Sequence, residues 1–441
     1  MSDGSTHDRS SASNNLHDHP GALTSFVEVP SDSHFPIQNL PYGVFRPRQG
    51  STRVGVAIGE MVVDLALLGE AGLLGERARV ERFFADSSLN RFMLAGRAEW
   101  SHVRSTLTRL LSADCPDLRD NSTLRSQAFH RVSDVAMLLP VEVKGYTDFY
   151  SSIEHATNVG ALFRGRENAL LPNWRHVPIA YDGRPSSIVV SGTNFYRPVG
   201  QTKPTEDGGP IFGPCKSLDF ELELAFLVGT ESSLGESIPV SRAEEHLFGM
   251  LLLNDWSARD IQKWEYQPLG PFLAKNFCTS VSPWVVTMAA LEPFKVPARA
   301  QEPEPLPYLR SARQVFDITL EVALRSSAMK ENEELVVCKG NSKNLYWDHC
   351  QQLAHHASNG CPMQVGDIFA SGTISGDAPD SLGSMLELTQ AGKSPLMLPG
   401  GEERRSLQDG DSVTIRGWCQ GNGYRVGFGE VVGAVLPARA Q

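Results

Sequence analysis

The sequence lacks both a long apolar run and paired cysteines. Its longest apolar stretches, such as FGMLLL, are far shorter than the roughly 20 residues of a membrane-spanning helix, so we expect no membrane span. The seven cysteines are scattered, odd in number and without a C-x-x-C pair, which predicts free thiols rather than a disulfide framework. The first residues also lack the charged-then-apolar layout of a signal peptide.

Basic residues are outnumbered, and no run of Lys or Arg occurs. The chain has 51 Asp and Glu against 40 Lys and Arg, for a net charge of -11 at pH 7. A nucleic acid or an anionic membrane repels such a chain, so we expect neither as a partner. The charge is typical of a soluble cytoplasmic protein, or of one that gathers acidic groups around cations.

Several common active-site motifs are missing. The sequence has no P-loop and no His-Glu-x-x-His, and GESIP places Pro239 where a Gly-x-Ser-x-Gly motif needs its last glycine. In GNGYRVGFG, three residues separate Gly423 from Gly427, which breaks the dinucleotide-binding pattern and favours a β-hairpin. The sequence therefore offers no serine nucleophile and no nucleotide site of these types.

The length of 441 residues predicts two or three domains. The composition and the hydrophobic pattern change twice along the chain. Residues 1–22 are rich in Ser, Asp, Asn and His and predict a disordered tail. Residues 23–138 predict a small N-terminal domain, with short strands first and helical spacing from about Gly75 to Arg131. From 139 to 441, short apolar runs broken by Gly, Pro and Asn predict a mainly β domain.

Helices are predicted at few places in this second domain. Ser241 to Glu244 is a candidate capping box that opens a short helix, and YWDHCQQLAHHASNG predicts another that ends at Gly360. The remaining apolar runs predict strands: SSIVVSG, ELELAFLVG, MLLLND, SPWVVTM, FDITLEVAL, SMLELT, SVTIRGW and YRVGFGEVVGAVL.

The stretch SLDFELELAF contains a row of three carboxylates. Asp219, Glu221 and Glu223 occupy alternate positions, so on a strand they share one face. Asp148 in GYTDFYSS and Asp255 in LLLNDWSARD also lie at the ends of predicted strands. One interpretation is the solvated face of an antiparallel strand, which is the commoner meaning of such alternation. The other is a site where carboxylates from separate segments hold a hard divalent cation.

Two further groups could surround such a cation. If WSARDIQKWEY is a helix, then Arg259, Gln262 and Tyr266 lie on one face. That face could bind a polar anionic ligand, or it could be an ordinary polar helix surface. His155 lies seven residues after Asp148, and a glutamate, Glu387, sits inside an apolar run where burial would require a partner.

At these residues the chain resembles the fumarylacetoacetase family. The matching stretches are long: DFYSSIEHATNVGALFRGRENALLPNW, LDFELELAFLVG, FGMLLLNDWSARDIQKWEYQPLGPFLAK, ASGTISG and GYRVGFGEVVG. The similarity runs from about residue 139 to the C-terminus and is looser in the N-terminal region. It implies a small N-terminal domain resembling an SH3-like β-barrel, a larger mixed β-roll catalytic domain, and a homodimer.

The resemblance also implies a ligand set and a cofactor of Ca²⁺, Mg²⁺ or both. The implied metal ligands are Asp148, Glu221, Glu223 and Asp255, with a second ion held near Asp255, Lys275 and Thr279. Asp219 matches no ligand and is expected to support the site. The positions that match substrate contacts are Tyr150, Arg164, Tyr181, Gln262, Tyr266 and Thr373.

The implied reaction is hydrolysis of a carbon–carbon bond in the small β-diketo acid 4-fumarylacetoacetate, the last step of tyrosine and phenylalanine breakdown. We expect His155 to act as general base on water, oriented by Glu387. Arg259, Gln262 and Lys275 match groups that stabilise the oxyanion. Two alternatives stay open: a related oxo-acid decarboxylase, hydratase or isomerase of the same fold, and a non-catalytic Ca²⁺-binding β module.

Overall fold

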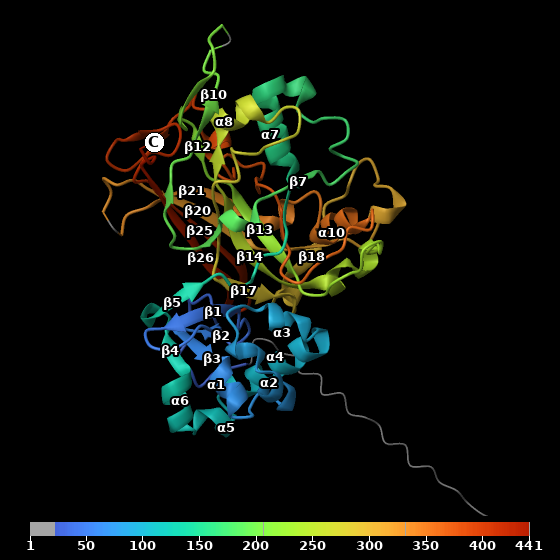
Figure 1. The fold of residues 1–441 in the computed structure, drawn as a ribbon, viewed down its shortest axis with the longest axis vertical. Helices are drawn as coiled ribbons and strands as arrows, with labels where there is room; N and C mark the ends of the chain where they lie inside the picture. The colour runs from blue at the N-terminus through green and yellow to red at the C-terminus, as the bar shows by residue number, and fades with distance from the viewer. Residues whose placement is uncertain (1–22, 206, 331, 441) are drawn as a thin grey trace, which may run out of the picture.

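The structure is a computed structural model that describes residues 23–205, 207–330 and 332–440 (Figure 1). The tail predicted at 1–22 lies outside the described residues. The N-terminal part is the lower body in Figure 1, and the larger C-terminal part lies above it. Within the described chain, no helix combines the length and apolar character needed to cross a membrane.

Five antiparallel strands form the N-terminal sheet in the order β4-β3-β2-β1-β5. Their bounds are β1 (Tyr42–Pro47), β2 (Arg53–Ile58), β3 (Met61–Asp64), β4 (Phe129–Arg131) and β5 (Val135–Leu138). The strands β4 and β5 stand at opposite ends of this order. They are nevertheless consecutive in the sequence, because only the short turn η3 (Val132–Asp134) separates them.

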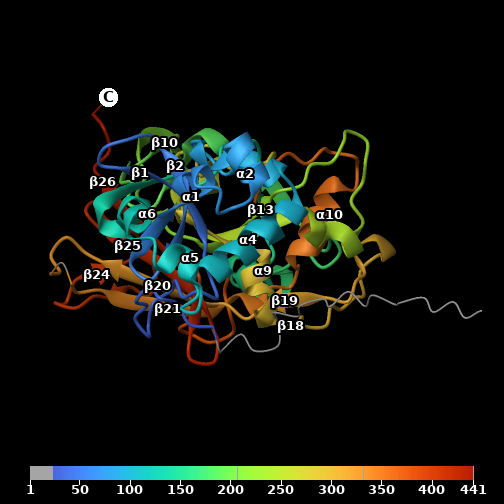
Figure 2. The ribbon, with the colours of Figure 1, turned by 90° about the horizontal axis from the view of Figure 1, so that it is seen from below.

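The helical spacing predicted from about Gly75 onward is confirmed, and a further helix precedes it. Asp64 starts this first helix, because its side chain accepts hydrogen bonds from the backbone N–H groups of Ala66 and Leu67. The N-terminal helices are α1 (Leu65–Glu70), α2 (Glu76–Glu81), α3 (Asn90–Leu94), α4 (Arg97–Leu111), α5 (Pro116–Arg119) and α6 (Ser122–Ala128), with the turn η2 (Phe83–Ala85). They cluster around the small sheet when seen from below (Figure 2).

A mixed sheet forms the centre of the molecule, in the order β1-β17-β14-β13-β22-β6-β7. Its pairs are antiparallel except β22 with β6 and β16 with β8, which are parallel. Gly43 of β1 pairs with Trp284 of β17, and a Cβ at Gly43 would lie 2.7 Å from the indole ring, so the junction requires glycine. The strands are β6 (Tyr146–Phe149), β7 (Ala180–Asp182), β8 (Ile188–Val190), β13 (Leu222–Val228), β14 (Leu247–Asp255), β16 (Thr279–Val281), β17 (Trp284–Thr287) and β22 (Ile368–Ala370).

A second sheet, β21-β20-β25-β26-β9, covers one face of the central sheet. Gly417 permits the close contact, since a Cβ there would lie 2.8 Å from the side chain of Leu252. The hairpin predicted at GNGYRVGFG is confirmed as the turn between β25 and β26. The strands are β9 (Phe195–Tyr196), β20 (Thr319–Arg325), β21 (Leu335–Asn341), β25 (Ser412–Gln420) and β26 (Arg425–Leu436).

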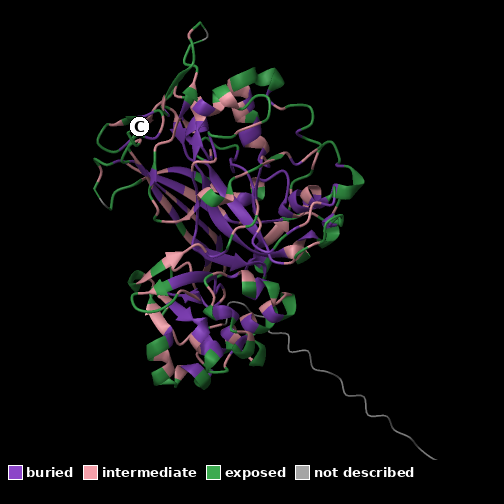
Figure 3. Ribbon diagram, in the orientation of Figure 1, coloured by how far each residue is buried: buried purple, intermediate pink, exposed green. Residues whose placement is uncertain are grey.

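The N-terminal part covers the opposite face, so β13 and β14 are buried on both sides (Figure 3). Leu224 and Leu252 pack in the core beneath the second sheet, whereas Ala225 and Leu251 pack with the N-terminal residues. This double burial explains the near-continuous apolar sequence of the two strands. The mainly β fold class with mixed sheets is therefore confirmed.

Shorter elements complete the C-terminal part. The helices are α7 (Ile153–Arg164), α8 (Arg259–Glu265), α9 (Met288–Leu291), α10 (His349–Ala357) and α11 (Met385–Leu388). The 3₁₀ turns are η4 (Arg166–Asn168), η5 (Pro185–Ser187), η6 (Val240–His246), η7 (Glu292–Phe294), η8 (Pro307–Leu309) and η9 (Ser342–Asn344). The short strands are β10 (Val199–Thr202), β11 (Ile211–Pro214), β12 (Leu218–Asp219), β15 (Ser257–Ala258), β18 (Lys295–Pro297), β19 (Gln314–Phe316), β23 (Leu396–Met397) and β24 (Glu403–Arg404).

Two local predictions are wrong, and one of the two interpretations of the carboxylate row is excluded. The proposed capping box at Ser241 does not form, because η6 begins after Pro239 and has no side-chain cap. The strand predicted at SMLELT is the short helix α11, which Ser384 caps by accepting from the N–H of Glu387. The solvated-face interpretation also fails, since all three carboxylates of the row are buried.

Candidate active site

Three buried carboxylates meet at the ends of neighbouring strands. Asp148 is the third residue of the four-residue strand β6, Glu223 lies near the start of β13 and Asp255 ends β14, and each is at most 1% exposed. One oxygen from each lies within 4.8 Å of the other two. The strand order places them together, because β13 lies between β14 and β22, and β22 pairs with β6.

The electrostatics of these three groups favour a cation. Burial without enough positive charge raises the pKa of Asp148 and Glu223 well above the usual range, and neighbouring carboxylates raise both further. Asp148 Oδ1 and Glu223 Oε1 have no hydrogen-bond partner, although both are buried. Oxygen atoms left bare in this way fit a hard divalent ion such as Ca²⁺ or Mg²⁺.

Glu221 stands beside this trio but is held differently. One oxygen lies 2.6 Å from the guanidinium of Arg259, and the other accepts a hydrogen bond from Lys275, whose ammonium also lies 2.6 Å from Asp255. Burial favours the neutral acid, but Arg259 and Lys275 outweigh it and hold the pKa of Glu221 far below its usual value. Glu221 is therefore an ionised link between the carboxylate cluster and two buried cations.

Hydroxyl groups cover the remaining side of the cluster. The Tyr181 hydroxyl lies 2.7 Å from Asp255 Oδ2 and 2.9 Å from Asp148 Oδ2. Thr279 Oγ1 donates to Asp255 at 3.3 Å. Tyr146, which the sequence reasoning missed, places its hydroxyl 3.4 Å from Asp148. The signal was present, because residues two apart on a strand share a face.

A histidine and a glutamate form the second part of the site. His155 Nδ1 lies 2.6 Å from Glu387 Oε2, and both residues are buried. His155 lies in the first turn of α7, where Ser152 accepts a hydrogen bond from its backbone N–H. Glu387 is carried by α11, so the pair joins segments 232 residues apart in the sequence.

Other donors surround the Glu387 carboxylate. Asn158 donates to Oε1 at 2.9 Å, while Ser375 and Ser384 donate to Oε2 at 2.9 and 2.8 Å. Burial raises the pKa of Glu387, but His155, Asn158 and Ser384 more than offset it and lower the pKa below the usual value. Sequence reasoning missed all three donors, although Asn158 lies one helical turn after His155.

Asp219 connects the two parts of the site. Its Oδ2 accepts from Arg259 Nε at 2.7 Å, and its two oxygens accept from the backbone N–H groups of Met385 and Leu386 at 2.6 and 3.1 Å. The same carboxylate thus orients the Arg259 side chain and the start of the helix that carries Glu387.

The other predicted residues divide into two groups. The Tyr150 ring lies edge-on to the His155 ring, with 5.5 Å between the ring centroids. Gln262 accepts a hydrogen bond from Arg259 at 3.2 Å, and Thr373 is buried just after β22. Arg164 instead donates to its own loop, at the carbonyls of residues 168 and 169, and Tyr266 is 40% exposed. The structure does not bring these last two side chains into the cluster.

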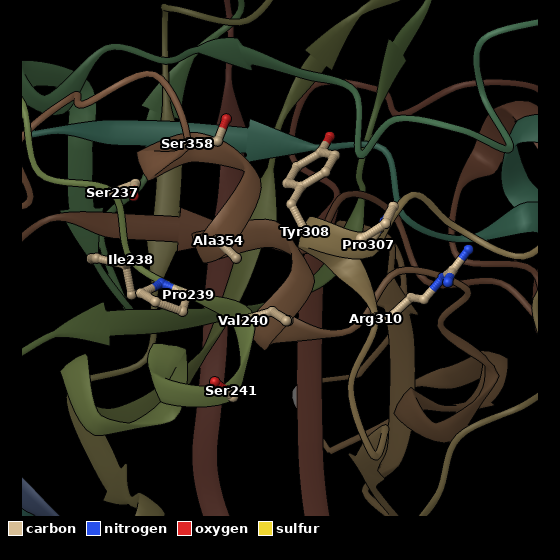
Figure 4. Close-up of a pocket in the computed structure, with 10 residues that line it drawn as sticks. All are labelled: Ser237, Ile238, Pro239, Val240, Ser241, Pro307, Tyr308, Arg310, Ala354 and Ser358. Carbon is tan, nitrogen blue, oxygen red and sulfur yellow. The ribbon is translucent and has the colours of Figure 1, made fainter.

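The surface also has a hollow of about 610 Å³ between η6, η8 and α10 (Figure 4). It is lined by Ser237, Ile238, Pro239, Val240, Ser241, Pro307, Tyr308, Arg310, Ala354 and Ser358. This lining includes none of the residues predicted for the site, so the hollow is not the place where the acidic and histidine groups meet.

A cluster of buried acids near a buried His–Glu pair, on a mixed sheet covered on both faces, defines an enzyme suited to hydrolytic acid–base chemistry. Residues 38–140 match the family model described as "Fumarylacetoacetase N-terminal", and residues 144–435 match "Fumarylacetoacetate (FAA) hydrolase C-terminal". The chain belongs to the fumarylacetoacetase family.

Individual relatives agree with this assignment. The fumarylacetoacetase of Dictyostelium discoideum is 53% identical over 422 residues, which cover 94% of this chain and 98% of the relative. Those of Rattus norvegicus and Homo sapiens are each 52% identical over 416 residues, covering 94% of this chain and 99% of the relative.

Solved structures share the fold at much lower identity. A fumarylacetoacetate hydrolase from psychrophilic Exiguobacterium antarcticum is 19% identical, with a TM-score of 0.50, and the match covers 91% of this chain and 100% of that one. Cg1458 with an inhibitor is 12% identical, with a TM-score of 0.51, covering 90% and 100%.

Proposed function

We propose that this protein hydrolyses 4-fumarylacetoacetate to fumarate and acetoacetate, the last step of tyrosine and phenylalanine breakdown. Full-length similarity to fumarylacetoacetases supports this activity. In the reaction, the bond between the fumaryl carbonyl carbon and the acetoacetate methylene carbon breaks. Water supplies hydroxide to that carbonyl carbon and a proton to the leaving carbanion, so the atoms balance.

The contact between His155 and Glu387 carries the proposal. Because an ionised carboxylate only accepts, Glu387 fixes the proton of His155 on Nδ1 and leaves Nε2 as the acceptor. Nε2 can then remove a proton from water and later return it to the leaving group. The low pKa of Glu387 keeps it ionised during this cycle.

The cationic side chains next to the pair would stabilise negative charge on the attacked carbonyl oxygen. Arg259 and Lys275 are at most 10% exposed, so bulk water screens their charges little. Gln262 accepts from Arg259 through its carbonyl oxygen, which leaves its amide N–H groups to donate. Removal of one such donor typically slows catalysis by about a hundred- to a thousandfold.

The bare oxygens of Asp148 and Glu223, with Asp255 and Glu221, would hold a Ca²⁺ or Mg²⁺ ion. A bound ion of this kind supplies Lewis-acid stabilisation of charge on oxygen. Tyr181 and Thr279 would orient the ligands through their hydrogen bonds to Asp148 and Asp255. The family resemblance further implies a homodimer in the cytoplasm. Light scattering on the purified protein can test whether it is a dimer.

Product analysis on a panel of substrates tests the activity. We expect fumarate and acetoacetate in equal amounts from fumarylacetoacetate. Decarboxylated, hydrated or isomerised oxo-acids in their place would favour a related enzyme of the same fold. Metal binding without turnover of any acylpyruvate-type substrate would favour a non-catalytic Ca²⁺-binding module.

A further inference from the structure

A second cluster of metal-ligating side chains lies outside the site described above. Glu244 on η6 faces His349 and Cys350, the first two residues of α10. One ligand atom from each of the three lies within 4.8 Å of the others. The cluster therefore spans the contact between two segments that are about a hundred residues apart in the sequence.

His349 is the most deeply buried member of the cluster. The residue is 6% exposed, and its Nε2 atom has no hydrogen-bond partner although it is buried. Nε2 points toward Glu244, with 3.8 Å between it and Oε2, which is too long for a hydrogen bond. A buried ring nitrogen without a partner costs free energy unless another group occupies the gap.

Lys295 is the charged neighbour that could oppose a cation here. Its ammonium lies 2.6 Å from Glu244 Oε1 and 2.7 Å from Glu292 Oε2. Lys295 thus pairs with Oε1, the oxygen of Glu244 that does not face His349. The Glu292 carboxylate pairs with the same ammonium group. Oε2 of Glu244 faces His349 and is not bound by Lys295.

The donor set distinguishes this cluster from the carboxylate cluster. Imidazole, thiolate and a single carboxylate are the ligands of borderline cations such as Zn²⁺, whereas four carboxylates suit Ca²⁺ or Mg²⁺. Bonds of about 2.0–2.3 Å to zinc require the ligand atoms to approach within about 3.3–3.8 Å of one another. The separations here are therefore near those of a bound site, and closure by about an ångström completes it.

We propose that Glu244, His349 and Cys350 form a binding site for a Zn²⁺-type cation, with solvent at the fourth position. Glu244 and Cys350 are only partly buried, so an ion can reach them from the surface. Ala354, one helical turn after Cys350, lines the hollow in Figure 4, which places the site beside that hollow. Binding releases the thiol proton of Cys350 to solvent.

Cobalt tests the site with a signal that the carboxylate cluster cannot give. The chelator-treated full chain is titrated with Co²⁺ alone, and the absorbance band of thiolate-to-cobalt charge transfer is recorded. We expect the band in the wild type and in Cys361→Ser, a control at another half-buried cysteine, and its loss in Cys350→Ser. A wild type without the band, or a Cys350→Ser variant that keeps it, overturns the proposal.

A measurement on the unaltered chain keeps the test independent of how the variants fold. Alkylation of each cysteine is followed by mass spectrometry with and without Zn²⁺. At zinc about tenfold above its Kd, we expect alkylation of Cys350 to slow about tenfold while Cys361 is unaffected. Equal rates at Cys350 with and without zinc contradict the site.

Discussion

Nδ1 of His155 lies 2.6 Å from Oε2 of Glu387, in a buried contact between α7 and α11. The contact sets which nitrogen of the imidazole can accept a proton. The Glu387 carboxylate is in turn held in place by hydrogen bonds from three further side chains. A base oriented in this way is the centre of the proposed reaction.

Replacement of His155 by alanine should remove the base. We expect kcat for fumarylacetoacetate to fall by about a hundred- to ten-thousandfold with a smaller change in KM. His176→Ala, at an exposed histidine of the following loop, is the matched control and should keep full activity. Near-normal turnover by His155→Ala would show that another group activates water.

The double variant Glu221→Gln, Glu223→Gln should lose the metal. Each substitution removes a charged oxygen while keeping nearly the same shape, so the divalent ion content of the purified protein should fall, and activity with it. The double variant Glu231→Gln, Glu236→Gln, at two exposed glutamates, controls for the change in net charge. If metal content and activity both stay at the wild-type level, the ion is bound elsewhere.

The stability of the metal-free protein should depend on pH. Asp148 and Glu223 have raised pKa values in the folded chain, so the folded state holds their protons more tightly than the unfolded state. Their contribution to stability is therefore lost as pH rises from about 4, the ordinary carboxyl value, through the folded pKa.

Added Ca²⁺ should reverse this loss, because the ion replaces those protons. At about one hundred times its Kd, calcium adds about 2.7 kcal/mol to the free energy of unfolding. We expect the rise in Tm of the chelator-treated protein to be larger near pH 8 than near pH 5. An Asp148→Asn variant should show a smaller difference in the rise in Tm between the two pH values. An equal rise in the wild type at both pH values would show that Ca²⁺ does not replace protons on these carboxylates.

Asp219 should be a positioning residue rather than a ligand. Asp219→Asn weakens the buried ion pair with Arg259, and removal of one partner from such a pair costs up to about 3–5 kcal/mol of unfolding free energy. We expect urea denaturation to show a loss of this order, together with a lower kcat and unchanged metal content. Asp117→Asn, which breaks an exposed pair with Arg109, should cost less than about 1 kcal/mol. A loss of metal in Asp219→Asn would contradict the assignment.

Much of the fold could be predicted from local pattern. The predicted apolar runs correspond to the strands β8, β13, β14, β17, β20, β25 and β26, and the predicted helix corresponds to α10. The strands β7, β9, β16, β21 and β22 and the cap of α10 at Asp348 were not predicted. The prediction of free cysteines is confirmed for all seven. The predicted strands and helix depend on residues that are close in the sequence, so a single sequence is enough to predict them.

The errors arise from contacts between distant segments. SMLELT has the apolar alternation of a strand, but Asp219, 166 residues away, accepts from the N–H of Met385 and stabilises a helix start there. The spacing of the carboxylate row alone could not exclude a solvated face, because no local signal shows that the N-terminal part and the second sheet cover both faces of β13. Among the missed donors to Glu387, only Asn158 is distant in the sequence, at 229 residues, whereas Ser375 and Ser384 lie 12 and three residues before Glu387.

A crystal structure with a phosphorus-based analogue of the tetrahedral intermediate would test the central claim most directly. We expect the analogue's oxyanion to contact Arg259 and Lys275 and His155 Nε2 to lie within hydrogen-bond distance of the position of the attacking water. We also expect Asp148 and Glu223 to hold a divalent ion. An analogue bound away from His155, for example in the hollow between η6 and α10, would contradict it.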